Sequence, residues 1–359
     1  MQVLLVRLRL IGDVVFTTPV IGALRRRYPT AHLTYLVEEA AAPAVATHPQ
    51  LDAVRVIPHR RGWARLGDDW RLGRELRRAR FDVAIDLHGG PRSAWLTWAT
   101  RAPVRVGYDV PGRSWMYTHR AHRPGGLRPR HSVENQWDLL GAFDPALAAP
   151  ADRTRDRVTM PVDPAARASV GSRLDALGVP GDARVIVLHV SAGNPFRRWP
   201  ESAFAALASA LAARGPERWV LVTSGPSDHD AAARVVAAAR AVHETGARVV
   251  DAEGLSLAEL RALMDRAALF VGGDSGPLHV ASTSDVPIVG LFGPTLPERS
   301  APWRPADIPT ASIDVGVLPC RPCHQRTCVP GDFRCLTGIS ADAVREAAER
   351  LLARAGARA

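Results

Sequence analysis

The sequence predicts an α/β protein built from two doubly wound parallel sheets. Short apolar runs of strand length alternate with helical patterns along the whole 359-residue chain, which is typical of parallel strands covered by helices. A stretch rich in Pro, Ala and charge, residues 144–164, interrupts this alternation before it starts again. The chain is longer than one average domain, so we expect two.

The predicted boundaries follow from these two runs of alternation. They are an N-terminal Rossmann-like domain over 1–150, a linker region over 151–180, a C-terminal Rossmann-like domain over 181–340 and a C-terminal helix over 341–359. In the first half we predict strands at 3–8, 32–37, 53–57, 82–87 and 104–107, and helices at 13–27, 69–79, 93–100 and 131–143. In the second half we predict strands at 184–189, 219–223, 248–251, 269–272 and 288–292, with helices between them.

The charge of the chain is strongly positive but evenly spread. The net charge is +10, and all 46 basic residues are Arg because the sequence contains no Lys. We find no basic patch with interleaved aromatic residues, so we expect no nucleic-acid partner. No stretch approaches the ~20 apolar residues of a membrane span. The first residues form a strand rather than a signal peptide, so we expect a cytoplasmic protein with at most peripheral membrane contact.

Several enzyme classes lose support from absent motifs. The chain has neither a phosphate-binding P-loop nor the G-x-G-x-x-G dinucleotide fingerprint, which argues against ATPases and dehydrogenases. Without Lys, Schiff-base chemistry on a lysine is impossible. The G-x-S-x-G elbow of common hydrolases is also absent.

One carboxylate stands where a strand pattern gives way to a helix pattern, in "VLLVRLRLIGDVVFTTPVIGALRRRYP". Asp13 could be the N-cap of a helix that starts at Val14, which would stabilise it by about 1 kcal/mol. It could also be a general base, because a carboxylate at the carboxyl end of a strand can take a proton from a nucleophile. The local sequence alone favours the cap.

Two stretches of the second half could bind an anion. In "HVSAGNPFRRWPESAFAAL" a strand ends at His189 and two arginines follow, of which Arg197 or Arg198 could grip a diphosphate. In "LFVGGDSGPLHVASTSDVPIVGLFGPT" a buried strand runs into Asp274 and Ser275 before a short helix. The alternative is that one of these two residues only caps that helix and that His279 packs in the core.

Four cysteines fall within sixteen residues, in "CRPCHQRTCVPGDFRC". In a cytosolic chain this spacing suggests a structural metal such as zinc, although reduced thiols or a local disulfide are equally compatible. The residues are Cys320, Cys323, Cys328 and Cys335.

Taken together, these stretches resemble the heptosyltransferases of glycosyltransferase family 9. The resemblance covers most of the chain in the same order, and the G-D-V-x-x-T-x-P and G-D-S-G-P-x-H motifs are its most specific parts. Further support comes from "DLHGGPRSAWLTWATRAPVRVGYD", "HSVENQWDLLGAF", "LSLAELRALMDRAALFVGGDSGPLHVAS", "VPIVGLFGPTLPERSAPW" and the Cys-containing tail.

The resemblance implies the GT-B fold, in which two Rossmann-like domains face each other across a cleft. The N-terminal domain would bind the acceptor and the C-terminal domain the nucleotide sugar. The implied reaction is inverting, metal-independent transfer of heptose from a nucleotide diphosphate, typically ADP-heptose, to a glycan or lipid-linked acceptor such as lipopolysaccharide core. No cofactor is required beyond the sugar nucleotide itself.

The family's functional residues map onto individual positions of this chain. Asp13 matches the catalytic base. Arg197 stands where family members usually carry Lys for the donor phosphates; arginine keeps the charge but is bulkier. The remaining matches to the donor site are Asp274, Ser275, Gly276, Pro277 and His279, with Asp228 or Asp230 as a candidate for the donor ribose.

Three other interpretations stay open from the sequence. One is a glycosyltransferase that uses another sugar nucleotide, since no residue identified above selects heptose or ADP. Another is a sugar-nucleotide epimerase with the same two-domain architecture. The third is a noncatalytic module that binds nucleotides or glycans.

Overall fold

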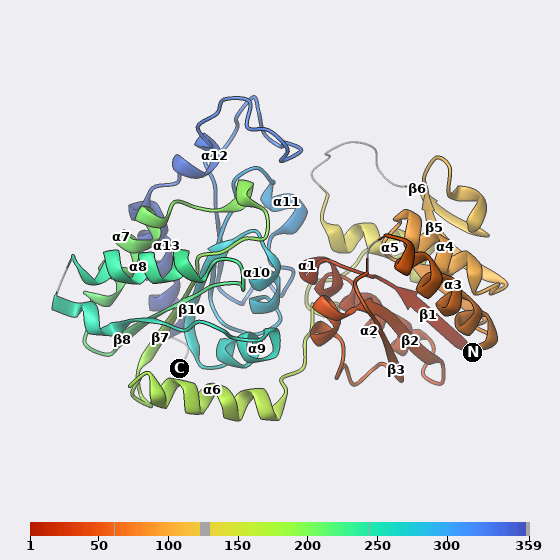
Figure 1. Cartoon of the computed structure of the whole chain (residues 1–359), viewed down its shortest axis with the longest axis horizontal. Coiled ribbons are helices and arrows are strands. Elements are labelled where there is room, and N and C mark those ends of the chain that lie inside the picture. The colour runs from red at the N-terminus through yellow and green to blue at the C-terminus, as the bar shows by residue number, and fades with distance from the viewer. Residues whose placement is uncertain (61, 123–129, 243, 357–359) are drawn as a thin grey trace. The chain divides into compact units, whose positions relative to one another are not determined.

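The computed structural model describes residues 1–60, 62–122, 130–242 and 244–356. The chain divides into two compact units, Met1–Pro161 and Val162–Ala359 (Figure 1). Each unit contains one six-stranded sheet in which all neighbouring strands run parallel. The predicted class, α/β with two Rossmann-like sheets, is confirmed.

The sheet of the first unit has the order β3-β2-β1-β4-β5-β6. This is the doubly wound order, in which the direction of winding reverses between β1 and β4. The strands are β1 (Gln2–Val6), β2 (His32–Glu38), β3 (Ala53–Ile57), β4 (Val83–Asp86), β5 (Val104–Asp109) and β6 (His119–His122). The helices are α1 (Ile11–Val15), α2 (Thr18–Arg27), α3 (Gly62–Arg78), α4 (Pro91–Ala99) and α5 (Ser132–Phe143), with short 3₁₀ turns η1 (Glu39–Ala44), η2 (Ser114–Met116) and η3 (Pro145–Leu147).

The helix predicted over 13–27 is in fact two helices, α1 and α2. The side chains of Thr17 and Thr18 donate to the backbone carbonyls of Val14 and Val15, at 2.7 and 2.8 Å. Pro19 has no N–H to offer the preceding turn. These three residues end α1 and start α2.

The sheet of the second unit repeats the same winding, with the order β12-β11-β10-β7-β8-β9 and its reversal between β7 and β10. The strands are β7 (Arg184–His189), β8 (Arg218–Thr223), β9 (Val249–Asp251), β10 (Ala267–Gly273), β11 (Ile288–Leu291) and β12 (Thr310–Ile313). The helices are α6 (Pro164–Ala176), α7 (Glu201–Ala212), α8 (His229–Arg240), α9 (Leu257–Met264), α10 (Gly276–Ala281), α11 (Pro297–Ser300), α12 (Arg334–Thr337) and α13 (Ala341–Gly356), with 3₁₀ turns η4 (Pro195–Arg197) and η5 (Glu244–Arg248).

Helices cover both faces of this sheet, which explains why its central strands β7, β10 and β11 are mainly apolar. Along β7, Leu188 packs into one core cluster with side chains from α7, α8 and α13, whereas Val187 packs into another with side chains from α6, α9 and α10. Figure 1 shows α6 below β7 and β8, and α7, α8 and α13 above them. Packing on both faces therefore fixes the strands, and with them the starting points of the loops at their carboxyl ends.

Several segments differ from the sequence expectation, among them residues 151–180, β6 and β12. The segment 151–180 holds α6, which Asp163 caps by accepting from the Ala165 N–H at 2.9 Å. The edge strands β6 and β12 had not been predicted, because their sequences HRAH and TASI show little apolar alternation. The predicted helix over 341–359 corresponds to α13, and residues 357–359 lie outside the described part. Within the described ranges, every helix is too short or too polar to cross a bilayer.

Candidate functional site

Asp13 is the third residue of α1, and its carboxylate pairs with the guanidinium of Arg7. The N-cap position of α1 is Leu10, and no side chain caps this helix. Asp13 therefore does not serve as the N-cap that the local sequence favoured. About a third of its side chain is exposed, at 31%, so the carboxylate can reach a ligand from solvent.

Arg7 connects the two strands between which the first sheet reverses its winding. It follows β1, is 9% exposed, and donates from Nη1 to the carbonyl of Leu87, which follows β4, at 2.7 Å. Its Nη2 pairs with Asp13. Ligands of doubly wound sheets bind at this reversal, beside the carboxyl ends of the strands. Asp13 thus lies at the expected ligand-binding edge of the first unit.

The backbone beside Asp13 is strained. Leu10 has a φ of 66°, a conformation that residues with side chains rarely adopt, and its side chain is 66% exposed. Such strain persists only where the surrounding structure imposes it, and it clusters at functional sites.

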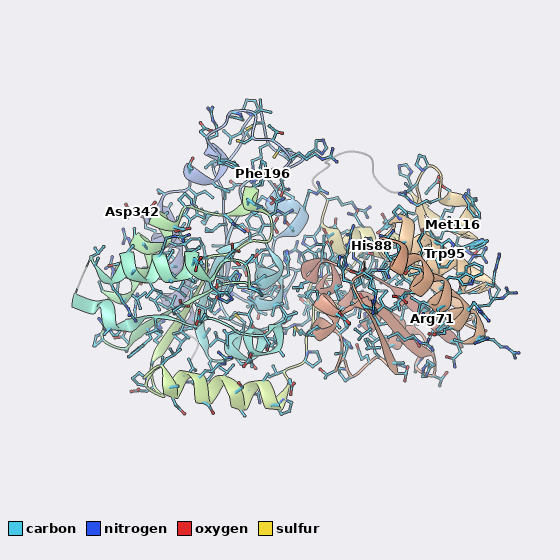
Figure 2. The ribbon with its side chains drawn as sticks, viewed as in Figure 1. Arg71, His88, Trp95, Met116, Phe196 and Asp342 are labelled. Atoms are coloured by element: carbon cyan, nitrogen blue, oxygen red, sulfur yellow. The ribbon has the colours of Figure 1, made fainter. Side chains whose placement is uncertain are left out.

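The turn after β4 is built on a buried carboxylate, Asp86. It accepts from the hydroxyls of Tyr117 and Ser93, at 2.6 and 3.0 Å. It also accepts from the backbone N–H groups of His88, labelled in Figure 2, and Gly89, both at 2.9 Å. Burial raises the pKa of Asp86, and these hydrogen bonds oppose that rise. Asp86 therefore holds the turn after β4, whose Leu87 carbonyl accepts the hydrogen bond from Arg7.

A charged cluster lies at the end of the neighbouring strand β2. Glu38 is the last residue of β2 and is 5% exposed. Its carboxylate accepts a hydrogen bond from Arg92 Nη1 at 2.5 Å and lies 2.7 Å from His59 Nδ1. Arg92 Nη2 also donates to Asp69 at 2.7 Å. A pocket of about 430 Å³ opens beside this cluster, and the charged residues that line it are Arg55, Arg60, Arg71, Arg92, Asp68, Asp69 and Glu75. Because the Glu38 N–H bonds to the Leu8 carbonyl at 2.7 Å, the cluster adjoins the loop that carries Asp13.

Arg197 and Asp274 meet at the corresponding reversal in the second unit. Arg197 ends η4, which follows β7, and Asp274 follows β10. Arg197 Nη1 lies 3.0 Å from the Asp274 carbonyl and 3.2 Å from its Oδ2. Arg197 Nε donates to Gln325 Oε1 at 2.7 Å. The arginine is thereby fixed at the carboxyl edge of the second sheet.

Asp274 is a buried carboxylate with partners on three sides. Thr295 Oγ1 donates to its Oδ2 at 2.5 Å, and His279 Nε2 lies 3.3 Å from its Oδ1. Burial alone would raise its pKa, but His279, the charge of Arg197 and the Thr295 hydroxyl together hold the pKa of Asp274 at about 2. Asp274 is therefore ionised at neutral pH and holds these groups in place.

Ser275 presents a polar atom without a partner beside this network. It occupies the N-cap position of α10, yet its side chain makes no cap hydrogen bond. In the part of the chain that the structure describes, its Oγ is buried and has no hydrogen-bond partner. Leaving such a group unsatisfied costs about 1–3 kcal/mol, which a bound ligand would remove. Gly276 and Pro277 open α10, and His279 is 5% exposed within it.

Gly273 allows the two loops to approach each other. A Cβ atom at this position would lie 2.9 Å from the Arg197 carbonyl oxygen, closer than real Cβ atoms come to other atoms. The lack of a side chain at Gly273 is therefore what lets the Arg197 loop pack on the end of β10.

The two candidates for the donor ribose differ in their surroundings. Asp228 is 6% exposed and pairs with Arg198 Nη2 at 2.9 Å. Asp230 lies exposed in the first turn of α8. The structure thus brings Arg197, Asp274, Ser275 and His279 together, whereas Asp228 has a partner of its own.

Other residues at these two sites had not been predicted from the sequence. They are Arg7, Asp86, Thr295 and Gln325. The G-P-T end of a quoted motif contains Thr295, but no local signal marks Gln325, which is 128 residues from Arg197.

The four cysteines are free thiols, each partly exposed. Over the described ranges, no three His, Cys, Asp or Glu side chains already form a metal-binding group. Thiolates are nevertheless preferred ligands of zinc and iron. The donor set therefore suits such an ion, and the thiols would have to draw closer to bind it.

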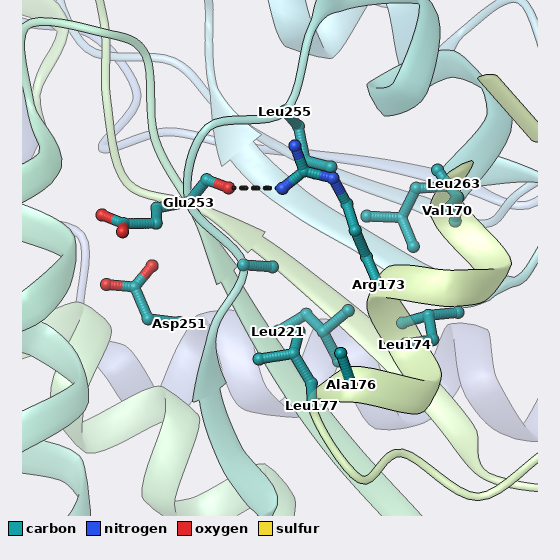
Figure 3. A pocket seen from close by; sticks show the side chains of 11 residues that line it. Val170, Arg173, Leu174, Ala176, Leu177, Leu221, Asp251, Glu253, Leu255 and Leu263 are labelled. Atoms are coloured by element: carbon teal, nitrogen blue, oxygen red, sulfur yellow. Dashed lines mark hydrogen bonds between the residues drawn. The ribbon is translucent and has the colours of Figure 1, made fainter.

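A further pocket of about 290 Å³ lies in the second unit, between α6, α9 and the end of β9 (Figure 3). Its walls are mainly apolar, and Arg173 at its edge donates from Nη1 to the Glu253 carbonyl at 3.2 Å. None of the predicted site residues lines it.

Comparison with known proteins identifies the family. The model of glycosyltransferase family 9 (heptosyltransferase) matches residues 69–332. Lipopolysaccharide heptosyltransferase 1 of Pseudomonas aeruginosa is 30% identical, over 91% of this chain and 87% of that protein. Lipopolysaccharide heptosyltransferase 3 of Escherichia coli is 29% identical, over 89% of this chain and 91% of that protein.

A solved structure has the same fold. The E. coli ADP-heptose lps heptosyltransferase II has a TM-score of 0.78 and 22% identity, with 99% of both chains covered. Because the family model spans well over half of the sequence, this chain belongs to glycosyltransferase family 9, the heptosyltransferases.

Proposed function

We propose that this glycosyltransferase moves heptose from ADP-heptose to a glycan or lipid-linked acceptor resembling lipopolysaccharide core, with inversion at the anomeric carbon and without a required metal ion. Relatives of this chain are named lipopolysaccharide heptosyltransferases, and one similar structure is named for ADP-heptose. The observation that carries the proposal is the pair of polar sites at the two winding reversals. One holds Asp13 with Arg7, and the other holds Arg197 with Asp274.

In this proposal Arg197 and Ser275 bind the donor diphosphate. Arg197 uses Nη1 and Nε within the protein, while among the described residues no partner engages Nη2. That N–H pair and the Ser275 hydroxyl can donate to phosphate oxygens. Asp274 is negatively charged and would repel a phosphate, so its role is to hold Arg197, Thr295 and His279. Asp228 or Asp230 remains the candidate for the ribose hydroxyls.

Asp13 is the proposed general base. The acceptor oxygen forms its bond to the anomeric carbon while the bond from that carbon to the diphosphate oxygen breaks. The acceptor proton passes to the Asp13 carboxylate, and the electron pair of the broken bond leaves with the nucleotide. Attack from the face opposite the leaving group inverts the configuration. Arg197 stabilises the negative charge that develops on the leaving diphosphate, so the transfer needs no metal ion.

The acceptor would bind to the first unit. The pocket beside Arg92 is lined by four arginines, some of them balanced by carboxylates. Arg92 also pairs with Glu38, whose N–H bonds to the Leu8 carbonyl ahead of Asp13. Arginine recognises phosphate and carboxylate groups bidentately, which suits a phosphorylated or acidic glycan. A lipid-linked acceptor would bring the protein to a membrane surface by peripheral contact.

A donor panel tests this proposal. The full-length protein is heated with ADP-, UDP- and GDP-linked sugars, and the donor that raises its melting temperature is then offered with candidate acceptors. We expect ADP-heptose to stabilise the protein and to transfer heptose in the presence of EDTA, with NMR showing the inverted anomer.

Each of the other outcomes would support a different function. Stabilisation by a different sugar nucleotide would change the donor. A changed sugar released without acceptor would indicate an epimerase. Tight binding without transfer to any acceptor would indicate a noncatalytic binding module.

A further inference from the structure

The segment that carries the four cysteines, residues 314–335, is here called the cysteine loop. Between the end of β12 and the start of α12 it forms neither helix nor strand, and none of its apolar side chains is buried. Val317 and Val329, for example, are 100% and 89% exposed. Structureless segments of this length within a domain are uncommon, and one that buries so little needs another source of order.

The cysteine loop supports the segment that carries Arg197. Gln325 Oε1 accepts from both Asn194 Nδ2, at 2.9 Å, and Arg197 Nε, at 2.7 Å. The ring of Phe333 packs on Phe196, labelled in Figure 2, with 5.4 Å between the ring centroids. Residues 194–197 therefore contact the loop at two points, and one of these is the guanidinium assigned to the donor phosphates.

Both contact residues of the loop have strained backbones. Gln325 has a φ of 56° and Phe333 a φ of 49°, in the left-handed region that favours glycine. Non-glycine residues stay there only when their surroundings hold them. Gln325 lies between Cys323 and Cys328, and Phe333 lies between Cys328 and Cys335. The cysteines thus flank the two positions that most need to be held.

All four thiols are free, partly exposed and confined to the sixteen residues from Cys320 to Cys335. Thiols this close along an irregular segment can converge on one ion, and zinc prefers a set of four thiolates. Arg334, next to Cys335, pairs with Asp332 at 2.9 Å.

The base of the loop is already anchored. Arg321 donates to the carbonyls of Gly316 and Thr295, at 2.7 and 2.9 Å, and to the carboxylate of Asp314, at 2.7 Å. Thr295 also holds Asp274. The loop therefore joins the donor site at its base as well as through Gln325 and Phe333.

We propose that Cys320, Cys323, Cys328 and Cys335 bind one divalent ion of the zinc type, and that this ion holds Gln325 and Phe333 against residues 194–197 and so sets the affinity for the donor nucleotide. Each thiol releases its proton to solvent as it ligates the ion. The ion is structural and takes no part in the transfer. The effect on donor affinity rests on the proposed function, whereas metal binding and the ordering of residues 194–197 do not.

Metal binding is tested on the full-length protein with Zn²⁺ and Co²⁺. We expect one Zn²⁺ per chain by elemental analysis, and the intense ultraviolet charge-transfer absorption of thiolate-bound Co²⁺. Four thiols should react with a disulfide reagent only after chelation. The double variant Cys320→Ser/Cys323→Ser should bind neither ion. Absence of bound metal, or loss of the free thiols as disulfides in intact mass, would overturn the site.

The coupling to residues 194–197 is tested by hydrogen exchange and by ADP titration. Removal of Zn²⁺ should speed amide exchange in the peptide covering 194–197 and weaken ADP binding about tenfold, the effect of one hydrogen bond to a charged group. Gln325→Ala should keep one Zn²⁺ and show the weaker ADP binding. The matched control Val329→Ala, at an exposed position of the same loop, should change neither measurement.

The possible failures can be told apart. Metal binding with unchanged exchange at 194–197 would refute the coupling. Faster exchange on metal removal, in a protein that binds no nucleotide, would support the proposed role of the ion in ordering residues 194–197. The same result would refute the proposed donor.

Discussion

Arg7 and Asp13 form an ion pair at the end of β1, and the same guanidinium donates to the Leu87 carbonyl after β4 at 2.7 Å. A single buried side chain therefore joins the two strands between which the sheet reverses and fixes the carboxylate of α1. Asp86 holds the turn on which this arginine rests. The position of Asp13 thus depends on its pairing with Arg7, on the bond from Arg7 to the Leu87 carbonyl, and on the bonds from Asp86 that hold that turn.

Asp13→Asn should reduce the turnover number by about 10²- to 10⁴-fold, because the amide cannot accept the acceptor proton. Affinity for ADP, measured by calorimetry, should stay unchanged, since the proposed donor groups belong to the other unit. Glu39→Gln, at an exposed carboxylate of the first unit, is the control. Near-normal turnover in the Asp13 variant would remove this residue from the mechanism.

Arg7→Met should lower the turnover number while leaving ADP affinity intact. The methionine fills similar space but leaves the Leu87 carbonyl and the Asp13 carboxylate without their donor. The buried Leu87 carbonyl, left without a hydrogen bond, should also cost about 1–3 kcal/mol of unfolding free energy. Arg7→Lys restores the charge, so partial recovery of turnover would separate positioning of Asp13 from a general loss of stability. Equal turnover in Arg7→Met and the wild type would refute the positioning role.

Arg197→Ala should weaken ADP binding about 10- to 100-fold, the range expected for charge-assisted hydrogen bonds. Affinity for the acceptor should change far less. Arg197→Lys should recover part of the donor affinity, because lysine keeps the charge and loses the fork of N–H groups. Arg234→Ala, an exposed arginine of the same unit that pairs with Glu201, is the matched control. Unchanged donor affinity in Arg197→Ala would contradict the assignment.

The stability of the protein should depend on pH through His189. This residue ends β7, is 3% exposed, and burial lowers its pKa from 6.5 to about 4. Between these values the unfolded chain binds a proton that the folded chain does not. The free energy of unfolding should therefore fall as the pH drops through this window, by at most about 1.4 kcal/mol per pH unit from this group.

Denaturant titrations across that window check the contribution of His189. His189→Gln cannot titrate, so its unfolding free energy should fall less steeply than that of the wild type. His122→Gln, at an exposed histidine, should keep the wild-type slope. Identical slopes for the wild type and His189→Gln would exclude this histidine as a source of the pH dependence.

The sequence predicted the buried strands well because strands covered on both faces are apolar throughout. It missed β6 and β12, which are short edge strands with little apolar alternation. It also joined α1 to α2, because the apolar pattern continues through the threonines that end the first helix.

At the candidate site, motifs predicted the residues that lie next to the ends of β1, β7 and β10. The partners that hold them come from distant parts of the chain. Thr295 reaches Asp274 from the loop after β11, and Gln325 reaches Arg197 across 128 residues. Only the packing of the loops brings such pairs together, and neither the period of a helix nor that of a strand encodes it.

Gly273→Ala should disrupt the donor site through backbone contact alone. The new Cβ would meet the Arg197 carbonyl oxygen at 2.9 Å, and because that atom belongs to the backbone, the Arg197 loop must shift. We expect ADP affinity to fall about as far as in Arg197→Ala, with the guanidinium still present but displaced. Gly193→Ala is the control, because Gly193 lies on the same β7–η4 connection as Arg197. A Cβ atom at position 193 would meet no atom within 4 Å. Calorimetry on both variants decides the point: equal ADP affinity for Gly273→Ala and Gly193→Ala would mean that the close approach of the two loops is not needed for donor binding.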